Sequence, residues 1–404
     1  MKIYLLLNQP YPNGYALTKR FHLYAKGFIK NGHQVKIIIP HPTEYEDKLG
    51  NKLISGTYEN VSFEYKWKST NRSNSFFKRR YHDLAGSLKT GFTLIKDRPD
   101  VVISSSFSFL FFLYLKFISF LFPFKFFHEK NEVDYMHEDN ISYIKRLLIK
   151  LNESVFHGFV VINSQLLNYL TNELKFNKSS IIVPILVEDF KMNRELPVNK
   201  TIVYTGTYQE RKDGILTILN AFAQIKNRYP EYKLVLTGSP QRSADYKKIL
   251  RIIENKELWK QVHFTGYLSE EDLRKVLTSA NMLILAKPEN RQNLYNFPTK
   301  LGEYLISGRP VITTKVGETG KILKDNDNVI FSEFDISDIS EKMEFIINNP
   351  ELTAAIGARG REYALKNFDY LVHTNRMADR FQTMIEISGH VRSASKLVPS
   401  MKQN

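Results

Sequence analysis

At 404 residues the chain is too long for one ordinary hydrophobic core, so its length predicts two or three domains. Hydrophobic residues make up 43% and charged residues 25%, a balance that excludes a disordered chain and indicates a globular protein. The absence of cysteine excludes disulfides and cysteine-ligated metal sites and agrees with a reducing cytoplasm. The start, "MKIYLLLNQPYPNG", lacks the long apolar run of a signal peptide and reads as a first β-strand.

The chain is strongly basic. Lys and Arg outnumber Asp and Glu by 57 to 42, which gives a net charge of +15. Such an excess favours polyanionic partners: nucleic acid, anionic lipid or phosphorylated small molecules. Neither a compact basic stripe with aromatics nor a known binding module is present, which argues against nucleic acid. The densest basic cluster, "FFKRRYH" with Lys78, Arg79 and Arg80, is either a solvated loop or a membrane-facing patch.

Short β-branched apolar runs alternate with longer amphipathic stretches along the first half of the chain. This alternation predicts βαβ units and a parallel sheet. The predicted strands are residues 2–7, 33–40, 100–105, 124–128 and 158–164.

Residues 101–127, "VVISSSFSFLFFLYLKFISFLFPFKFF", are intensely apolar. A membrane-spanning helix needs about 20 apolar residues, but Lys116 interrupts the run and Pro123 ends it. A buried strand plus a core helix is therefore the first interpretation. An apolar face lying in the plane of a membrane and a true span are the alternatives.

The second half restarts after a junction near 188–200. Its predicted strands are residues 201–206, 232–238, 262–266, 282–286, 310–314 and 328–331, with helices over 213–228, 242–256, 269–279 and 298–307 and a helical tail over 351–391. Two Rossmann-like domains with the active cleft between them account for this order.

The stretch "NFPTKLGEYLISGRPVITT", residues 296–314, predicts a loop, a short helix and a strand. Pro298 suits the first helical turn and Gly308 the residue just past the end. Free N–H groups at the helix start attract anions, and Lys300 adds a full positive charge there. Glu303 lies one turn further on nearly the same face, where its carboxylate can accept hydrogen bonds from ribose hydroxyls. The pair indicates a nucleotide site; a local ion pair on a capped helix is the alternative.

Glycines recur at the ends of successive strands in the second half. Gly206 ends the first, Gly238 the second and Gly266 the third. In an open parallel sheet these ends lie along the carboxyl edge, where ligands bind and a missing side chain permits close approach. Arg211 and Lys212, in the loop after Gly206, are candidates to reach a diphosphate.

The stretches "TGTYQERKDG", "LTGSP", "FTGYLSEEDL" and "NFPTKLGEYLISGRPVITT" follow one another as in the carboxyl-terminal half of retaining glycosyltransferase family 4, which the chain resembles. "NQPYPNGYALTKRFHLYAKGFIKNGHQVKIIIP" is similar to that family's first loop and second strand, so the resemblance covers about residues 1–370. It implies an α/β protein of the GT-B fold, with two Rossmann-like doubly wound domains facing a central cleft. The implied parts are 1–188 on the acceptor side, 189–370 for the nucleotide sugar, and 371–404 for a helix that crosses back and a tail.

The resemblance assigns roles to residues. Lys300 and either Arg211 or Lys212 would hold the donor diphosphate as catalytic cations. Tyr295 stands where many members have a glutamate that contacts the donor sugar, and a subgroup with an FP-[ST]-K motif matches better, which leaves the sugar open. The implied donor-binding residues are Asn13, Gly14, Gly206, Gly238, Tyr267, Leu268, Tyr295, Phe297, Pro298, Thr299 and Glu303.

The segment "FHEKNEVDYMHED", residues 127–139, follows a predicted strand whose end would face the cleft in this family. His128 is therefore a catalytic candidate, and Glu129 and Glu132 are acceptor-side candidates. A solvated charged loop is the alternative. A metal site of His128, Glu132 and His137 matches no known ligand spacing.

The implied reaction is transfer of a sugar, with retention, from a nucleotide-diphosphate sugar, UDP being favoured over GDP, to a hydroxyl of a glycan or lipid-linked acceptor in cell-surface polysaccharide synthesis. The family implies no metal and no required cofactor. A non-catalytic nucleotide-binding protein and a GT-B nucleotide-sugar epimerase remain alternatives. The expected location is the cytoplasm, with a possible contact at the inner face of an anionic membrane.

Overall fold

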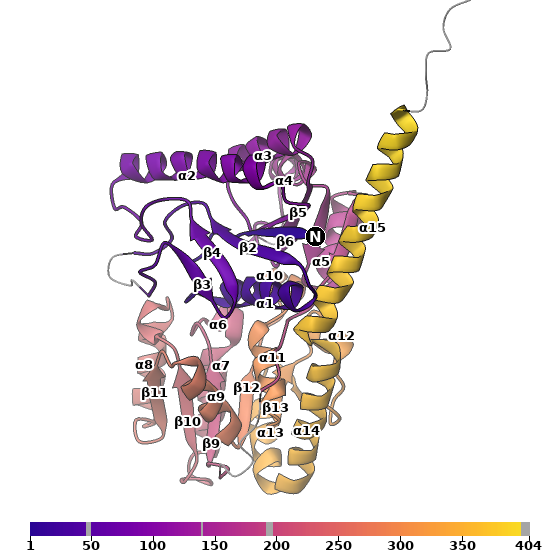
Figure 1. Ribbon diagram of the computed structural model, residues 1–404. Coiled ribbons are helices and arrows are strands. Elements are labelled where there is room, and N and C mark those ends of the chain that lie inside the picture. The colour runs from indigo at the N-terminus through magenta and orange to yellow at the C-terminus, as the bar shows by residue number, and fades with distance from the viewer. Residues whose placement is uncertain (46–49, 139, 191–196, 397–404) are drawn as a thin grey trace, which may run out of the picture.

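The computed structural model describes residues 1–45, 50–138, 140–190 and 197–396, with the side chains of 242 and 388–396 left aside. Two parallel sheets, each with helices on both faces, form two domains stacked one above the other (Figure 1). This arrangement confirms the predicted fold class. The sheets lie on either side of the predicted junction at 188–200, of which residues 191–196 lie outside the described part.

The first domain holds an eight-stranded sheet in the order β3-β4-β2-β1-β5-β6-β7-β8. All its strand pairs are parallel except β3 with β4, which form an antiparallel edge. Three strands were not predicted: β3 is exposed at every residue, and β4 and β8 are short and partly polar. The bounds are β1 Lys2–Leu6, β2 Gln34–Ile39, β3 Ser55–Tyr58, β4 Val61–Tyr65, β5 Val101–Ser104, β6 Lys125–Lys130, β7 Gly158–Val161 and β8 Ser179–Ile182.

The second domain holds a six-stranded, wholly parallel sheet in the order β11-β10-β9-β12-β13-β14. All six strands agree with the sequence prediction. Five of them are mostly buried, and buried parallel strands read as apolar runs. The edge strand β11 is buried at only one of its five residues and ends at the predicted Gly266. The bounds are β9 Thr201–Thr205, β10 Lys233–Thr237, β11 Val262–Gly266, β12 Met282–Leu285, β13 Val311–Thr314 and β14 Ile330–Ser332.

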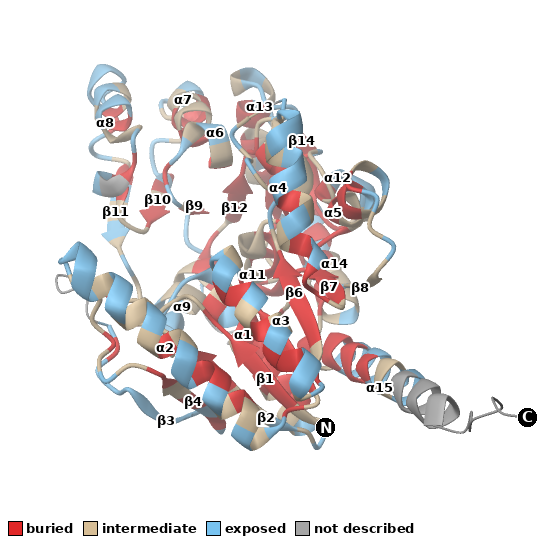
Figure 2. Cartoon of the chain, turned by 90° about the horizontal axis from the view of Figure 1, so that it is seen from above, coloured by how far each residue is buried: buried red, intermediate tan, exposed pale blue. Residues whose placement is uncertain are grey.

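Helices connect the parallel strands, and most bury one face on a sheet while the other is exposed (Figure 2). In the first domain they are α1 Ala16–Lys30, α2 Phe76–Asp97, α3 Phe109–Leu121, α4 Tyr143–Ser154 and α5 Ser164–Asn168, with a π-helical turn at Tyr169–Glu173. In the second they are α6 Glu210–Asp213, α7 Ile215–Ile225, α8 Tyr246–Asn255, α9 Glu270–Ser279, α10 Arg291–Tyr295, α11 Thr299–Ile306, α12 Thr319–Ile322, α13 Ile336–Asn348 and α14 Pro350–Asn367, with a 3-10 turn at Pro240–Arg242.

The last helix, α15 Tyr370–Lys396, returns to the first domain and packs along α1 (Figure 1). Its start is held by the backbone of Val187, which donates to Phe368 O at 2.9 Å and accepts from Tyr370 N at 3.2 Å. Further along, Phe381 lies against Phe28 with ring centroids 6.3 Å apart. The helix therefore ties the two domains together.

The apolar segment 101–127 forms β5, α3 and the start of β6. Strand β5 is buried at every residue, and α3 buries Phe111, Phe112 and Leu115 but exposes its opposite side. Among the described residues, no helix has the length and apolar character needed to cross a membrane. The segment is therefore a buried strand and a helix that is only half in the core.

Candidate functional site

The glycines at the strand ends of the second domain lie next to one another. The backbone N–H of Gly238 donates to Gly266 O at 2.8 Å, and Gly238 has a φ of +104°, which a side chain would strain. A Cβ on Gly206 would lie 1.8 Å from the Tyr204 hydroxyl. These positions keep the carboxyl edge of β9 and β10 free of side chains.

Helix α11 is fixed on its sheet by its buried face. The Tyr304 hydroxyl accepts a hydrogen bond from Thr205 N of β9 at 2.7 Å. A Cβ on Gly302 would lie 2.9 Å from Val187 Cγ1, so the glycine lets the helix approach the chain that joins the domains. The helix begins at Thr299, one residue later than predicted, so that Pro298 is its N-cap rather than a residue of the first turn. Gly308 follows the end of the helix with a φ of +70°.

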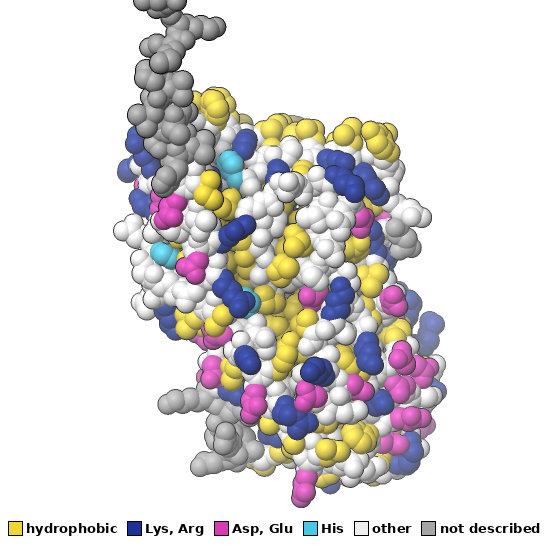
Figure 3. Space-filling view, turned by 90° about the vertical axis from the view of Figure 1, so that its right-hand side faces the viewer, with side chains coloured by type: hydrophobic (Ala, Val, Ile, Leu, Met, Phe, Trp, Pro, Cys, Tyr) yellow, Lys and Arg dark blue, Asp and Glu magenta, His cyan; other side chains and the backbone are white. Residues whose placement is uncertain are grey.

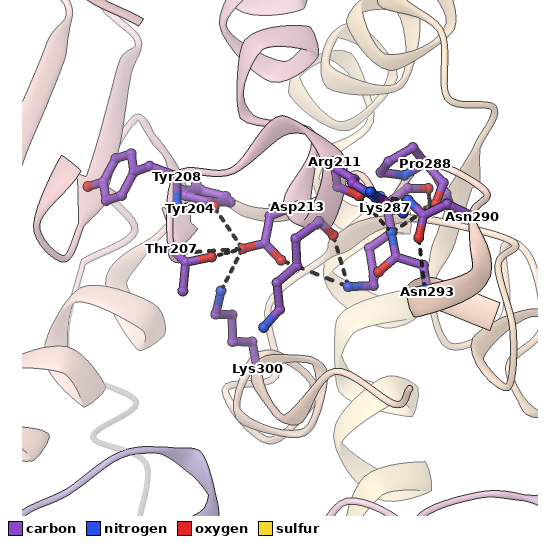
Figure 4. Close-up of polar contacts among 12 residues, drawn as sticks. Tyr204, Thr207, Tyr208, Arg211, Asp213, Lys287, Pro288, Asn290, Asn293 and Lys300 are labelled. Carbon is purple, nitrogen blue, oxygen red and sulfur yellow. Dashed lines mark hydrogen bonds and ion pairs between the residues drawn. The ribbon is translucent and has the colours of Figure 1, made fainter. Parts of the chain in front are cut away.

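The buried carboxylate of Asp213 is the centre of a charged cluster (Figure 4). Its Oδ2 lies 3.1 Å from Lys300 Nζ and accepts hydrogen bonds from Thr207 Oγ1 at 3.0 Å and from the Tyr204 hydroxyl at 3.2 Å. Although burial favours the neutral acid, Lys300 and Lys287 hold the pKa of Asp213 well below its usual range. Lys300 is therefore oriented at the start of α11 by a carboxylate at the end of α6.

Lys287, directly after β12, is a member of this cluster that the sequence analysis missed. Its side chain is only 4% exposed, its Nζ lies 3.8 Å from Asp213 Oδ1, and it donates to Lys212 O at 3.0 Å. Burial lowers the pKa of Lys287 to about 8, although Asp213 opposes the shift. Lys287 follows a buried strand in "MLILAK", and this position after a strand end is the feature that identified the glycines, so it could also have identified this lysine.

Arg211 and Lys212 lie in α6, the single turn that ends at Asp213. The carbonyl of Arg211 accepts hydrogen bonds from Asn290 Nδ2 at 2.7 Å and from Asn293 Nδ2 at 3.2 Å, while its side chain is exposed. The structure thus brings the backbone of the predicted cationic loop to the Asp213 cluster. Lys300 and Lys287 are the lysines that reach the carboxylate itself.

Glu303 faces the first domain from α11. Its Oε1 accepts a hydrogen bond from Lys19 Nζ of α1 at 2.7 Å, and Lys19 also lies 3.6 Å from Glu270 of α9. These three side chains line a cavity between the domains, together with Leu273, Arg274 and Ile306. Glu303, the residue predicted to bind the ribose, therefore lines the interdomain cavity and is paired there with a lysine.

The other predicted donor contacts lie on loops. Asn13 and Gly14 are exposed in the loop before α1, where Asn13 N donates to Asn51 Oδ1 at 2.8 Å. A Cβ on Gly14 would lie 2.3 Å from Pro10 O, so the tight loop needs a glycine. Tyr267, which is 69% exposed, and Leu268 connect β11 to α9.

The structure does not bring the side chains of Tyr295 and Phe297 to the cavity that Glu303 lines. The Tyr295 hydroxyl donates to Glu173 Oε1 of the first domain at 2.8 Å. Phe297 is buried against Phe368, with ring centroids 5.7 Å apart. The Tyr295 side chain thus links the two domains and that of Phe297 is buried, so a donor contact at these positions would come from the backbone.

His128 lies at the end of β6 but is buried. Its Nδ1 is 2.7 Å from Glu153 Oε2 and its Nε2 is 3.2 Å from Ser106 Oγ. Lys130 also binds Glu153, at 2.8 Å, and the contacts with His128 and Lys130 hold the pKa of Glu153 well below its usual range in spite of its burial. Both ring nitrogens of His128 therefore have partners within a buried network.

Glu129 does not face the cleft, contrary to its assignment as an acceptor-side candidate. Successive residues of a strand point to opposite faces, and Glu129 points away from His128 to bind Arg20 Nε at 2.6 Å and the Tyr24 hydroxyl. Its side chain has no exposed area. Glu132, by contrast, is exposed in the loop after β6, and its charge acts on Lys287 across the domains.

Candidate metal ligands do not gather in the part of the chain that the structure describes. No three His, Asp or Glu side chains there are grouped to hold an ion. His137 is exposed while His128 is buried with Glu153, so these two do not converge.

Two Rossmann-like domains with a charged strand-end cluster on one side of the gap define the GT-B class of structures. Among solved structures, sucrose-phosphate synthase from Thermosynechococcus elongatus superposes with a TM-score of 0.75 at 16% identity, covering 96% of this chain and 99% of that one. Anabaena Alr3699/HepE in complex with UDP-glucose superposes with a TM-score of 0.69 at 14% identity, covering 95% and 100%. The described part of the chain therefore has the GT-B fold.

Sequence comparison refines the class for the second domain. Residues 188–363 match the family described as Glycosyl transferases group 1. The capsular polysaccharide biosynthesis glycosyltransferase CapM of Staphylococcus aureus is 24% identical over 251 residues, which are 60% of this chain. The match spans 62% of the length of CapM. Residues 188–363 are thus similar to glycosyl transferases of group 1.

Proposed function

We propose that the protein is a retaining glycosyltransferase that moves a sugar from a nucleotide-diphosphate sugar to an acceptor hydroxyl. The observation that supports this most directly is the pair on α11. Lys300 stands in the first helical turn beside Asp213, and Glu303 opens one turn further into the interdomain cavity. A lysine beside free helical N–H groups suits a diphosphate, and a carboxylate one turn away suits the ribose of the same nucleotide.

The chemistry follows from where charge develops. The bond between the anomeric carbon and the diphosphate oxygen breaks, so negative charge grows on the leaving group while the sugar becomes positive. Lys300, the start of α11 and the exposed Arg211 would stabilise that leaving group. Asp213 keeps Lys300 oriented in advance, so no reorganisation is needed as the charge appears.

We assign no carboxylate as a nucleophile. Glu303 serves the ribose, and Glu129 is closed off by Arg20. The acceptor oxygen would then attack on the face from which the diphosphate departs, and its proton would pass to the departing phosphate oxygen. This route retains the anomeric configuration.

The donor is proposed to be a UDP-sugar and the acceptor a glycan or lipid-linked hydroxyl in cell-surface polysaccharide synthesis. The UDP-glucose complex of HepE supports the nucleotide, and the description of CapM supports the pathway class. No cofactor is required in this scheme, since side-chain cations and helical N–H groups hold the diphosphate.

The test is nucleotide release from a panel of UDP- and GDP-sugars, with and without glycan and lipid-linked acceptors. Lys300→Ala and Glu303→Ala are each expected to lower turnover by about 10²-fold or more, the scale of one lost electrostatic contact in a transition state. Lys260→Ala and Glu351→Ala, at exposed positions of the same domain, are matched controls that should keep full activity.

Normal activity in both α11 variants would contradict the assignment of Lys300 and Glu303 to the donor site. Nucleotide binding without release under any combination would favour the non-catalytic alternative. Formation of an epimerised sugar in place of a glycoside would favour the epimerase.

A further inference from the structure

Three helices of the first domain, α2, α3 and α4, expose large apolar side chains that have no place in the core. Phe77 and Phe120 are each 82% exposed and Tyr143 is 81% exposed. Leu110, Phe117 and Phe92 are also more than half exposed. Scattered exposed hydrophobics are normal, but a group of this size on adjoining helices indicates a binding surface.

The three helices lie on one side of the first sheet, away from α1 and α15 (Figure 1). The Tyr114 hydroxyl of α3 donates to Leu88 O of α2 at 3.3 Å. Phe112 of α3 packs against Phe156, just after α4, with ring centroids 4.7 Å apart. The outward sides of the three helices are here called the apolar face, and hydrophobic side chains gather along that end of the molecule (Figure 3).

On the three helices of the apolar face, basic residues outnumber acidic ones. Helix α2 carries Lys78, Arg79 and Arg80 in its first two turns, and α3 and α4 add further lysines and an arginine. The acids of these helices are neutralised or turned inward. Glu153 is fully buried, and Asp97 accepts from the Tyr4 hydroxyl at 2.7 Å. Asp83 lies 3.8 Å from Arg80, so it is already countered by a cation of the same helix.

The helices of the apolar face start at the carboxyl edge of the first sheet, whose loops contact the second domain, as Asn163 after β7 does by donating to Tyr295 O at 2.9 Å. Helices α2, α3 and α4 follow β4, β5 and β6, so each begins near the carboxyl end of a parallel strand. The loop before α4 contains Glu132, whose charge acts on Lys287 of the second domain. The helices of the apolar face thus start on the side of the first domain that faces the second.

We propose that the apolar face binds the surface of an anionic lipid bilayer. Aromatic and leucine side chains would enter the boundary between headgroups and acyl chains, while Lys78, Arg79 and Arg80 would contact the anionic headgroups. The combination of an outward apolar surface with an excess of cations matches such a membrane better than a second copy of this chain, whose face would repel it. The proposal rests on α2, α3 and α4 and is independent of the donor site on α11.

The test uses the full chain and vesicles of phosphatidylcholine alone or mixed with phosphatidylglycerol, measured by co-sedimentation. Binding is expected only with the anionic vesicles. It should fall as salt rises, because the screening length shrinks from about 10 Å at 0.1 M to about 3 Å at 1 M.

Variants separate the two contributions. Phe77→Ser with Phe120→Ser should weaken binding by about a hundredfold, since each buried ring contributes about a tenfold effect. Arg79→Ser with Arg80→Ser should weaken it roughly fivefold per residue. The control is Trp259→Ser with Leu352→Ser, at exposed apolar positions of the second domain, which should bind as the parent does. An unchanged urea denaturation midpoint for each variant shows that the chain is folded.

Three outcomes would overturn the proposal: equal binding to neutral and anionic vesicles, equal loss in the control variant, or no vesicle binding at all. A parent chain that is dimeric in light scattering, and that Phe77→Ser with Phe120→Ser makes monomeric without any vesicle binding, would assign the face to a second copy instead.

Discussion

Lys19 of α1 donates a hydrogen bond from Nζ to Oε1 of Glu303 in α11 at 2.7 Å, across the gap between the two domains. The two residues are 284 positions apart in the sequence. The side chain of Glu303 is 26% exposed and that of Lys19 is 45% exposed, so the pair is open to solvent and to a ligand. The carboxylate proposed to hold a ribose is therefore occupied by a lysine that a nucleotide would have to displace.

Replacing Lys19 by alanine should tighten UDP binding about two- to fivefold, because an exposed ion pair of this kind contributes about 0.2–1 kcal/mol that binding must offset. Isothermal titration with UDP measures the change. In a Glu303→Ala background the same substitution should have no effect. Weaker UDP binding by the Lys19 variant would mean that the lysine itself contacts the nucleotide.

Replacing Asp213 by asparagine should lower the free energy of unfolding by about 3 kcal/mol. The change leaves Lys287 buried without its countercharge, and breaking a buried pair on one side costs about that much. Urea denaturation gives the value. Adding Lys287→Met should restore part of the loss, because the second change removes the stranded charge; equal stability of the single and double variants would contradict this account.

Glu129→Ala is predicted to act on stability rather than on acceptor use. It strands the Arg20 guanidinium, which is 3% exposed and also donates to Val183 O at 2.6 Å. The expected loss is about 3–5 kcal/mol of unfolding free energy. The pair Arg20→Met with Glu129→Leu should lose less than the single change. A stable Glu129→Ala chain with an altered acceptor preference would return this residue to the active site.

The protein should lose stability as pH falls from about 6.5 to about 4, in part through His157. Burial and then the neighbouring cations Lys116 and Lys125 lower the pKa of His157 from 6.5 to about 4. Between pH 6.5 and pH 4, His157 is therefore protonated in the unfolded chain but neutral in the folded one, so acid favours unfolding. The contribution is about 2 kcal/mol, below the full linkage value because the ring is partly exposed.

Urea denaturation at pH 7 and at pH 4.5 tests this prediction with His157→Asn as the comparison. The variant should lose less stability than the parent over the same interval. An equal loss in the two proteins would show that other groups govern the acid response.

The central strands of both sheets were predictable because a strand buried on both faces must be apolar throughout, and such runs stand out in the sequence. The edge of the first sheet was not. Strand β3 is exposed along its whole length, so nothing in its sequence distinguishes it from a loop. Helix α11 was predictable from its proline, its glycine and the spacing of Lys300 and Glu303, which are all local features.

The sequence by itself determined the two parallel sheets, the strand-end glycines and the placing of Lys300 and Glu303 on one face of a helix. These features depend on periodicity and on backbone conformation, which a few neighbouring residues decide. Only the tertiary structure decided which charges meet: Lys287 with Asp213, Lys19 with Glu303, and Arg20 with Glu129. Coulomb energy depends on distance in space and on burial, and neither can be read from separation along the chain.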